Sequence, residues 1–209
     1  MKVFVFPKKI FTFIDKQVPA LSLTPFPTTR AKPKIMIKNK DEILIVAVNE
    51  GQSDALGNML DRFPDSKANY WAVVDFNLSS SVERLFIFNL ELRSVKKFLV
   101  AHGHNSGGEF ATVFSNDIGS KCSSLGIYKT LTTYNGKHGE SLQIEGLDET
   151  NSNAKEREVV VHSADYVVPN YDNKGRAGRS DGCFAVNPDD INEVIQCLEN
   201  GSYLNAWHT

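Results

Sequence analysis

The sequence is poor in cysteine and contains no long apolar run. Its three cysteines in 209 residues are an odd number, so at least one thiol is unpaired and no disulfide framework is implied. Among the first thirty residues the longest apolar stretch, 10–14, is interrupted by Thr12, and a secretory signal needs a longer apolar core. No run approaches the ~18 residues of a transmembrane helix. We therefore recognise no clear signal peptide and expect no membrane span.

The sequence also lacks a strong excess of charge of either sign. Its net charge is -2 and its pI is about 6.2, which argues against a surface that neutralises many phosphates, so nucleic acid is not an expected partner. The composition, 41% hydrophobic and 23% charged, is that of an ordinary globular protein. The length favours one domain, with room for an N-terminal extension.

Proline and apolar runs divide the chain into three parts. Residues 21–34 contain three prolines, which favours an extended linker, and we assign residues 1–40 to an N-terminal extension with this linker. Residues 41–69 are an uncertain connecting region, in which the apolar run 43–48 fits either a strand or a helix. Residues 70–209 form the expected main domain.

Residues 70–209 read as mostly β-structure. Strand-like runs rich in aromatic and β-branched residues occur at 70–76, 84–90, 95–102, 141–145 and 158–162. The pair Asn135-Gly136 predicts the turn of a β-hairpin. A helix is expected to start at 187–190 (Asn-Pro-Asp-Asp), with an apolar stripe that runs from Ile191 to Leu198. We predict a mainly β, α+β fold with this C-terminal helix packed on the sheet.

The segment Gly175–Cys183 is a glycine-rich loop that ends in a cysteine. Glycine allows tight turns and close approach of a ligand, and the amides around such a thiol can point at a carbonyl under attack. A free thiol is mostly protonated at neutral pH, so a nucleophilic cysteine needs a base nearby. His162, at the end of a predicted strand, is the leading candidate for this base.

These residues resemble the signature of murein L,D-transpeptidases, a histidine followed by a Ser/Thr-x-Gly-Cys loop. Here the signature is His162 with Ser180-Asp-Gly-Cys183. The resemblance extends over four ordered blocks, 101–130, 133–148, 159–167 and 175–186, and covers roughly residues 70–209. It implies a β-sandwich or barrel that acts on peptidoglycan stem peptides, with Cys183 as nucleophile, His162 as general base and no cofactor or metal.

The resemblance also implies roles for neighbours of these two residues. Ser163 follows the base and its backbone is expected to orient the ring, while Ser180, Gly182 and the Cys183 amide are candidates for orienting or for oxyanion binding. The chain departs from the wider family at Asp181, where many members have histidine, and at 184–185, which are Phe-Ala. Substrate carboxylate contacts are therefore not carried over. The nearby cations Arg176 and Arg179 are our candidates for this contact.

Each of these assignments has a structural alternative. A free cysteine is often simply buried, and a strand-end histidine or a loop arginine often serves only local hydrogen bonding or solvation. His102 and His104 would share one strand face and could bind a metal, yet no partner at a recognised spacing completes a site. We instead consider His102 and Ser123 as candidates that line the substrate cleft, with structural hydrogen bonding as the more ordinary role of each.

The resemblance leaves the acyl acceptor open. With an amine acceptor the chain would be a transpeptidase, and with water it would be an L,D-carboxypeptidase or a hydrolytic effector directed at another cell's wall. A non-catalytic wall-binding module is the alternative from a different class, and the intact Cys/His pair argues against it. The resemblance further implies a periplasmic or wall-associated location and inhibition by carbapenems.

Overall fold

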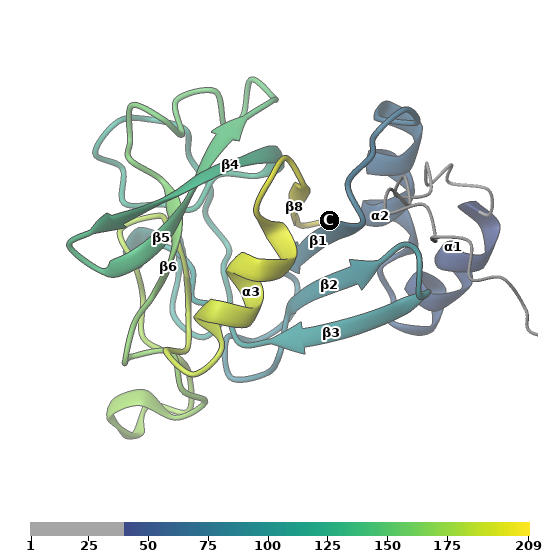
Figure 1. Ribbon diagram of the computed structural model, residues 1–209. Coiled ribbons are helices and arrows are strands. Elements are labelled where there is room, and N and C mark those ends of the chain that lie inside the picture. Colours follow the sequence, from purple (N-terminus) through teal and green to yellow (C-terminus); the bar gives the residue numbers. More distant parts are fainter. Residues whose placement is uncertain (1–39) are drawn as a thin grey trace, which may run out of the picture. The chain divides into compact units, whose positions relative to one another are not determined.

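The computed structural model describes residues 40–209, and every structural statement below concerns this part of the chain. The linker predicted at 21–34 lies outside the described residues. Residues 40–209 form one curled, eight-stranded sheet with three α-helices (Figure 1). The predicted mainly β fold, with a C-terminal helix packed on it, is confirmed.

The sheet has the strand order β3-β2-β1-β8-β4-β5-β6-β7. Most neighbours are antiparallel, but β1 pairs with β8 and β6 pairs with β7 in parallel. The strands are β1 (Tyr70–Asp75), β2 (Leu85–Asn89), β3 (Ser94–Phe98), β4 (Gly126–Gly136), β5 (Gly139–Gly146), β6 (Val160–Ser163), β7 (Phe184–Val186) and β8 (Tyr203–Trp207). Parallel pairing of β6 and β7 requires the long connection 164–183, which carries the glycine-rich loop.

Strand β1 is buried on both faces, which explains its unbroken apolar sequence. On one face, Ala72 and Val74 belong to the main core, which α3 (Ile191–Leu198) completes with its predicted apolar stripe. On the other face, Trp71 and Val73 belong to a second apolar cluster. Because successive side chains of β1 point to opposite faces, this one strand contributes to both apolar clusters.

The second cluster is closed by two helices that the sequence left undefined. The run 43–48 lies in α1 (Lys40–Asn49), which is followed by α2 (Ser53–Arg62). Both helices bury apolar side chains against the sheet beside β1 and β2 (Figure 1). Within residues 40–209 the longest helices have ten residues, and none is long and apolar enough to cross a membrane.

The hairpin turn and the start of the C-terminal helix lie two to four residues after the positions predicted from the sequence. The β4–β5 hairpin exists, but Asn135 pairs with Glu140 and Gly136 with Gly139, so its turn is Lys137-His138 and not Asn135-Gly136. The positive φ that the turn requires falls instead on Gly139, at +76°. Near the C-terminus, Asn187 Oδ1 accepts the Asp189 N–H at 2.9 Å, as a capping residue does, but this closes only a turn, and α3 begins at Ile191.

Candidate active site

The pairing of β6 with β7 brings the segment that carries Cys183 beside the strand that carries His162. His162 pairs with Ala185, and Val161 pairs with Phe184. Val161 and Phe184 face the main core, whereas Ala185 belongs to a separate small cluster on the opposite face. Cys183 immediately precedes β7, two residues before Ala185, which pairs with His162.

The ring of His162 is held in one orientation. Its Nδ1 lies 2.8 Å from the carbonyl oxygen of Ser163. A carbonyl only accepts, so Nδ1 carries the proton and Nε2 keeps a lone pair that can accept one. The ring is buried, at 2% exposure, and burial lowers the pKa of His162 below its ordinary value. His162 is therefore neutral in this structure and available as a base.

His138, at the tip of the β4–β5 hairpin, covers His162. The two imidazoles stack with 4.2 Å between centroids and 21° between planes. The hairpin tip is also joined to β6, because the Ser163 hydroxyl donates to the His138 carbonyl at 3.4 Å. No sequence signal pointed to His138, because the stacking depends on how the hairpin lies over β6.

Cys183 is half-buried and its thiol is in a poorly hydrated position. Its Sγ lies 3.5 Å from the carbonyl oxygen of Glu158, just before β6. Burial raises the pKa of the Cys183 thiol, while the Val160 amide and the charges of Lys137 and Arg157 oppose this rise. The lowered pKa of His162 and the raised pKa of Cys183 favour the neutral form of each group, an imidazole and a thiol.

The loop before Cys183 is held by the hydroxyl of Ser180. Ser180 Oγ accepts the Gly182 N–H at 3.1 Å and donates to the Cys183 carbonyl at 2.7 Å. Gly182 has φ +118°, and a Cβ built on it would lie 2.8 Å from Cys122 O and 2.9 Å from Arg157 Nη2. Only glycine fits this position. Its amide, a candidate oxyanion donor, is bonded to Ser180 in this conformation.

His102 lies beneath this loop with its ring fully buried. Its Nδ1 is 2.7 Å from Nη2 of Arg84, so Nδ1 is the acceptor, and its Nε2 is 3.5 Å from Gly107 O. Burial, then the charge of Arg84, lowers the pKa of His102 to about 4. His102 thus makes structural hydrogen bonds, which was the alternative role considered from the sequence. A contact between His102 and substrate stays a prediction.

The expectation that His102 and His104 share a strand face is wrong. His104 is exposed and begins a short 3-10 helix (His104–Ser106), because the extended segment ends at Gly103. In the described part of the chain, no group of three or more His, Cys, Asp or Glu side chains is arranged to hold a metal ion.

The sequence analysis did not predict a role for Arg84, because this residue only starts an apolar run and belongs to no motif. Its guanidinium is fully buried, donates to Val100 O and Leu78 O, and lies over the ring of Phe76 at 5.2 Å. Burial lowers its pKa to about 9, opposed by Asp75. Arg84 therefore fixes the segment 100–102 that supports the cysteine loop.

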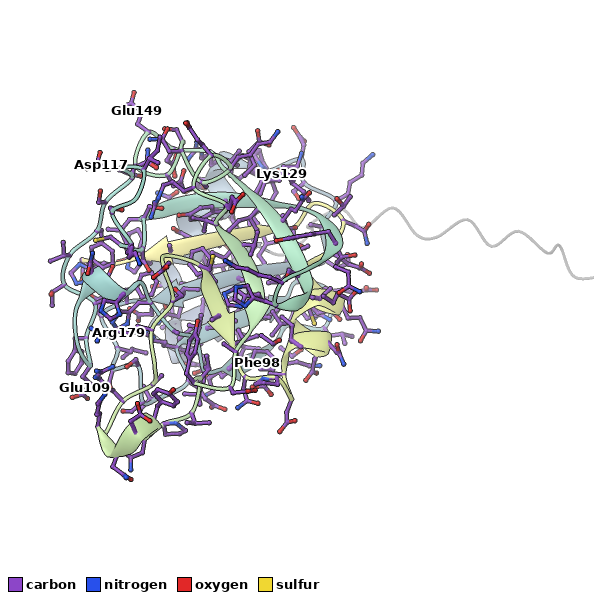
Figure 2. The ribbon with its side chains drawn as sticks, turned by 90° about the vertical axis from the view of Figure 1, so that its left-hand side faces the viewer. Phe98, Glu109, Asp117, Lys129, Glu149 and Arg179 are labelled. Carbon is purple, nitrogen blue, oxygen red and sulfur yellow. The ribbon has the colours of Figure 1, made fainter. Side chains whose placement is uncertain are left out.

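Ser123, Arg176 and Arg179 bind backbone groups in this structure. Ser123 is buried, and its hydroxyl accepts the Gly103 N–H at 3.0 Å. Arg179 donates to the carbonyls of His104 and Gly107 at 3.0 and 2.8 Å, and Arg176 donates to Ala177 O at 3.1 Å. Figure 2 shows Arg179 on the same side of the molecule as Glu109, two residues after Gly107, whose carbonyl accepts one of these bonds. Whether these side chains also contact substrate stays a prediction.

A pocket of about 260 Å³ lies next to the cysteine loop. It is lined by Ile118, Gly119 and Lys121 from one loop, by residues 156–158 before β6, and by Asp181. It adjoins Cys183 through the Glu158 carbonyl, which contacts the cysteine Sγ. Arg157 in this pocket was also missed, because two glutamates flank it in sequence and suggest only a solvated charged turn.

Comparison with known proteins identifies relatives of the chain. Residues 48–207 match the sequence model of the L,D-transpeptidase catalytic domain. No curated protein matches. Similar solved structures include an L,D-transpeptidase from Mycobacterium smegmatis (14% identity, TM-score 0.43, 68% of this chain and 59% of that one). Others are the transpeptidase LdtMt1 in complex with imipenem (12%, 0.42, 66% and 59%) and an L,D-transpeptidase from Mycobacterium tuberculosis H37Rv (15%, 0.38, 67% and 58%).

The chain thus spans less than two thirds of the length of these solved structures. The match to the catalytic-domain sequence covers more than half of the present chain and includes β1–β8 with the Cys183 loop. It also includes α2, which lies before residue 70. The family predicted from the sequence is confirmed.

Proposed function

Because the chain belongs to the L,D-transpeptidase catalytic-domain family, we propose that it cross-links peptidoglycan stem peptides through a thioester on Cys183. The observation that carries this proposal is the pairing of β6 with β7, which brings the cysteine loop beside the strand that carries His162. The bond from His162 Nδ1 to Ser163 O supports it further, since it leaves Nε2 as the acceptor of the thiol proton.

In the first half-reaction, the Cys183 sulfur attacks the carbonyl carbon of the third stem residue, a diamino acid in its L configuration. His162 Nε2 takes the thiol proton as the carbon–sulfur bond forms, because the resting thiol is neutral. The tetrahedral intermediate collapses when the carbon–nitrogen bond breaks. His162 returns the proton to the departing amine of D-alanine, and a thioester remains.

In the second half-reaction, the side-chain amine of another stem attacks the thioester carbonyl. His162 removes one proton from this amine, the new amide bond forms, and the carbon–sulfur bond breaks to restore the Cys183 thiol. The product is a direct cross-link between two third residues. No step of this scheme requires a metal or an organic cofactor.

Negative charge on the substrate oxygen must be stabilised in both half-reactions. The Gly182 and Cys183 amides are our candidates, and the Gly182 N–H would first have to leave the Ser180 hydroxyl that it now contacts. Arg157 and Lys137 add positive charge near the sulfur, which favours the thiolate as it forms. The proposed substrate implies that the enzyme acts in the periplasm or at the cell wall.

Product analysis tests this proposal. The full chain is incubated with disaccharide tetrapeptide muropeptides, and the products are separated by liquid chromatography and identified by mass spectrometry. We expect dimers joined between third residues, together with free D-alanine. Tripeptides without dimers would assign L,D-carboxypeptidase activity instead. Unchanged muropeptides would reject the enzymatic proposal and favour a wall-binding module.

A further inference from the structure

Arg157 has hydrogen-bond donors without partners. A guanidinium carries five N–H groups. Nη1 donates to Ser115 O at 3.0 Å and to Ser124 Oγ at 3.1 Å, and Nη2 donates to Cys122 O. Within residues 40–209, Nε has no acceptor, and Nη2 has one acceptor for its two hydrogens. Nε and Nη2 form the side of the guanidinium that binds a carboxylate with two parallel bonds.

Arg157 also has no carboxylate partner in the described part of the chain, although Glu156 and Glu158 flank it. Its side chain is half-buried in the pocket beside the cysteine loop. Three of its bonds go to neutral oxygen atoms, which hold the group in place without neutralising its charge. A guanidinium that is held in place in a pocket and has no carboxylate partner is suited to bind an anion.

The guanidinium lies close to the nucleophile. Nη2 is 2.9 Å from the position that a Cβ on Gly182 would take, and Gly182 directly precedes Cys183. Its positive charge acts on the Cys183 sulfur, whose pKa it lowers. An anion held by Arg157 would therefore lie beside the loop that carries the attacking sulfur.

We propose that Arg157 binds the terminal carboxylate of the D-amino acid that leaves the acyl donor. This inference rests on the proposed function. In a donor peptide, three covalent bonds separate the attacked carbonyl carbon from the terminal carboxylate carbon, so the two lie within roughly 4 Å. This short span matches the position of Arg157 next to the cysteine loop. Arg157 thereby makes the enzyme select stems that end one residue after the attacked carbonyl.

Two cations line this pocket, Lys121 and Arg157. Lys121 forms an ion pair with Asp181 at 3.3 Å. Arg176, Arg179 and Lys137 lie outside the pocket lining. The two glutamates of the pocket are exposed, so water screens their repulsion of a bound carboxylate. Arg157 is thus the cation of this pocket that has both charge and donors to offer.

The test compares two synthetic donors with the full-length chain. One is a tetrapeptide stem with a diamino acid at its third position and a terminal D-alanine, and the other is the same peptide ending in D-alaninamide. Release of D-alanine or D-alaninamide is measured by chromatography to obtain kcat/KM. We expect the wild type to prefer the acid by about 10- to 100-fold, as for a charge-assisted pair of hydrogen bonds.

Two variants separate recognition from structural support. Arg157→Gln removes a positive charge near Cys183 and should therefore slow both donors, but it should lower kcat/KM for the acid by about 10- to 100-fold more than for the amide. Arg157→Lys keeps the charge without the paired donors and should retain part of the preference. Lys155→Gln removes an exposed neighbouring charge outside the pocket and should keep the wild-type ratio.

The ratio of kcat/KM for the acid to kcat/KM for the amide, measured with the wild type, tests the inference even if a variant fails to fold. A ratio near one, with both peptides turned over, overturns the role of Arg157 and leaves the proposed function intact. An equal loss for both donors in Arg157→Gln also overturns it, since that result assigns Arg157 to holding the loop. Absence of release from either donor by the wild type rejects the proposed function, and this inference with it.

Discussion

The exposed ring of His138 stacks on the buried ring of His162, with their centroids 4.2 Å apart. The hairpin tip thus shields the proposed base from water on one side, and the Ser163 carbonyl holds the ring at its edge. Burial is the largest cause of the lowered pKa of His162, and the charges of His138 and Lys137 add to it. The hairpin therefore helps to keep His162 neutral.

Replacement of His138 by alanine should raise the pKa of His162, because the ring gains water and loses a positive neighbour. The acid limb of the rate of D-alanine release should then move to higher pH, since His162 must lose its proton to act as base. We also expect a rate several-fold lower at its optimum, because the ring is less well oriented. NMR titration of labelled histidines and a pH–rate profile measure both effects.

The matched control is His138→Phe, which keeps a stacking ring but removes the titratable group. It should retain most of the rate and most of the lowered pKa of His162, since burial is the dominant cause. If the phenylalanine and alanine variants behave alike, stacking has no part in positioning His162.

His102 should make the protein less stable in mild acid. The pKa of this histidine is about 4 in the folded chain, well below the ordinary value of 6.5. As the pH falls below 6.5, the unfolded chain binds a proton at this residue before the folded chain does. The free energy of unfolding therefore falls between about pH 6.5 and pH 4, by at most about 3 kcal/mol from this group.

His102→Asn isolates this contribution, because the asparagine Oδ1 can accept the Arg84 hydrogen bond but does not titrate. Urea unfolding at several pH values should show a shallower loss of stability below pH 6.5 in the variant than in the wild type. Parallel curves would mean that His102 does not remain neutral in the folded protein.

Sequence patterns predicted the parts of this molecule that depend on neighbours along the chain. The stripe from Ile191 to Leu198 identified α3, and the alternation and apolar runs identified the sheet. The hairpin turn was misplaced because Asn135-Gly136 tolerates positive φ but is not required to adopt it. Strand pairing with β5 extended β4 through both residues.

The residues of the candidate site show the same difference between local sequence patterns and long-range contacts. Cys183 and His162 were predicted as site residues because their loop and strand carry a recognisable local sequence. Arg157 and Arg84 were not, because their importance comes from contacts with segments 16 to 42 residues away, which no local pattern encodes. The run 43–48 stayed ambiguous for a related reason, since it is apolar all round and only packing against the sheet decides its conformation.

Gly182→Ala should disrupt the cysteine loop. The new Cβ would lie 2.8 Å from Cys122 O and 2.9 Å from Arg157 Nη2, and the residue would have to keep φ +118°. Backbone strain of this kind costs about 1–3 kcal/mol before any clash. We expect a lower melting temperature and a strong loss of D-alanine release, measured by calorimetry and chromatography.

Gly175→Ala is the control in the same loop. Gly175 also has positive φ, +65°, but a Cβ there would meet nothing within 4 Å. It should cost only about 1 kcal/mol in stability and leave the rate nearly unchanged. Equal effects of the two substitutions would show that the contacts around Gly182 have no special importance.

Cys183→Ala should abolish release of D-alanine from tetrapeptide stems, because no other thiol lies in the glycine-rich loop. Cys197→Ala should retain it, since Cys197 lies in α3 and is buried in the main core, so that its truncation affects only packing, by roughly 1 kcal/mol. Chromatographic assay of both purified variants checks this. Cys122 is also buried, and Cys122→Ala should likewise keep activity. Full activity in Cys183→Ala would reject the nucleophile.

Covalent inhibition by a carbapenem should follow from the same chemistry. A thiol that forms a thioester with a stem peptide should also open a strained cyclic amide, so intact-protein mass spectrometry should show one added drug mass. Because the thiol must lose its proton as it attacks and His162 must be unprotonated to take it, the adduct rate should rise with pH through the joint titration of Cys183 and His162. His162→Ala should slow the reaction by about 100-fold or more, the factor typical of a lost general base.

Locating the adduct needs one precaution. The tryptic peptide that begins at Ser180 contains both Cys183 and Cys197, since no lysine or arginine follows Arg179 in the sequence. Mapping in the Cys197→Ala variant removes this ambiguity, because a drug mass on that peptide can then lie only on Cys183. Iodoacetamide labelling is the companion measurement of thiol access. If iodoacetamide modifies Cys183 but the carbapenem does not, the thiol is reachable yet not equipped for acyl transfer, and a wall-binding module becomes the better account of this chain.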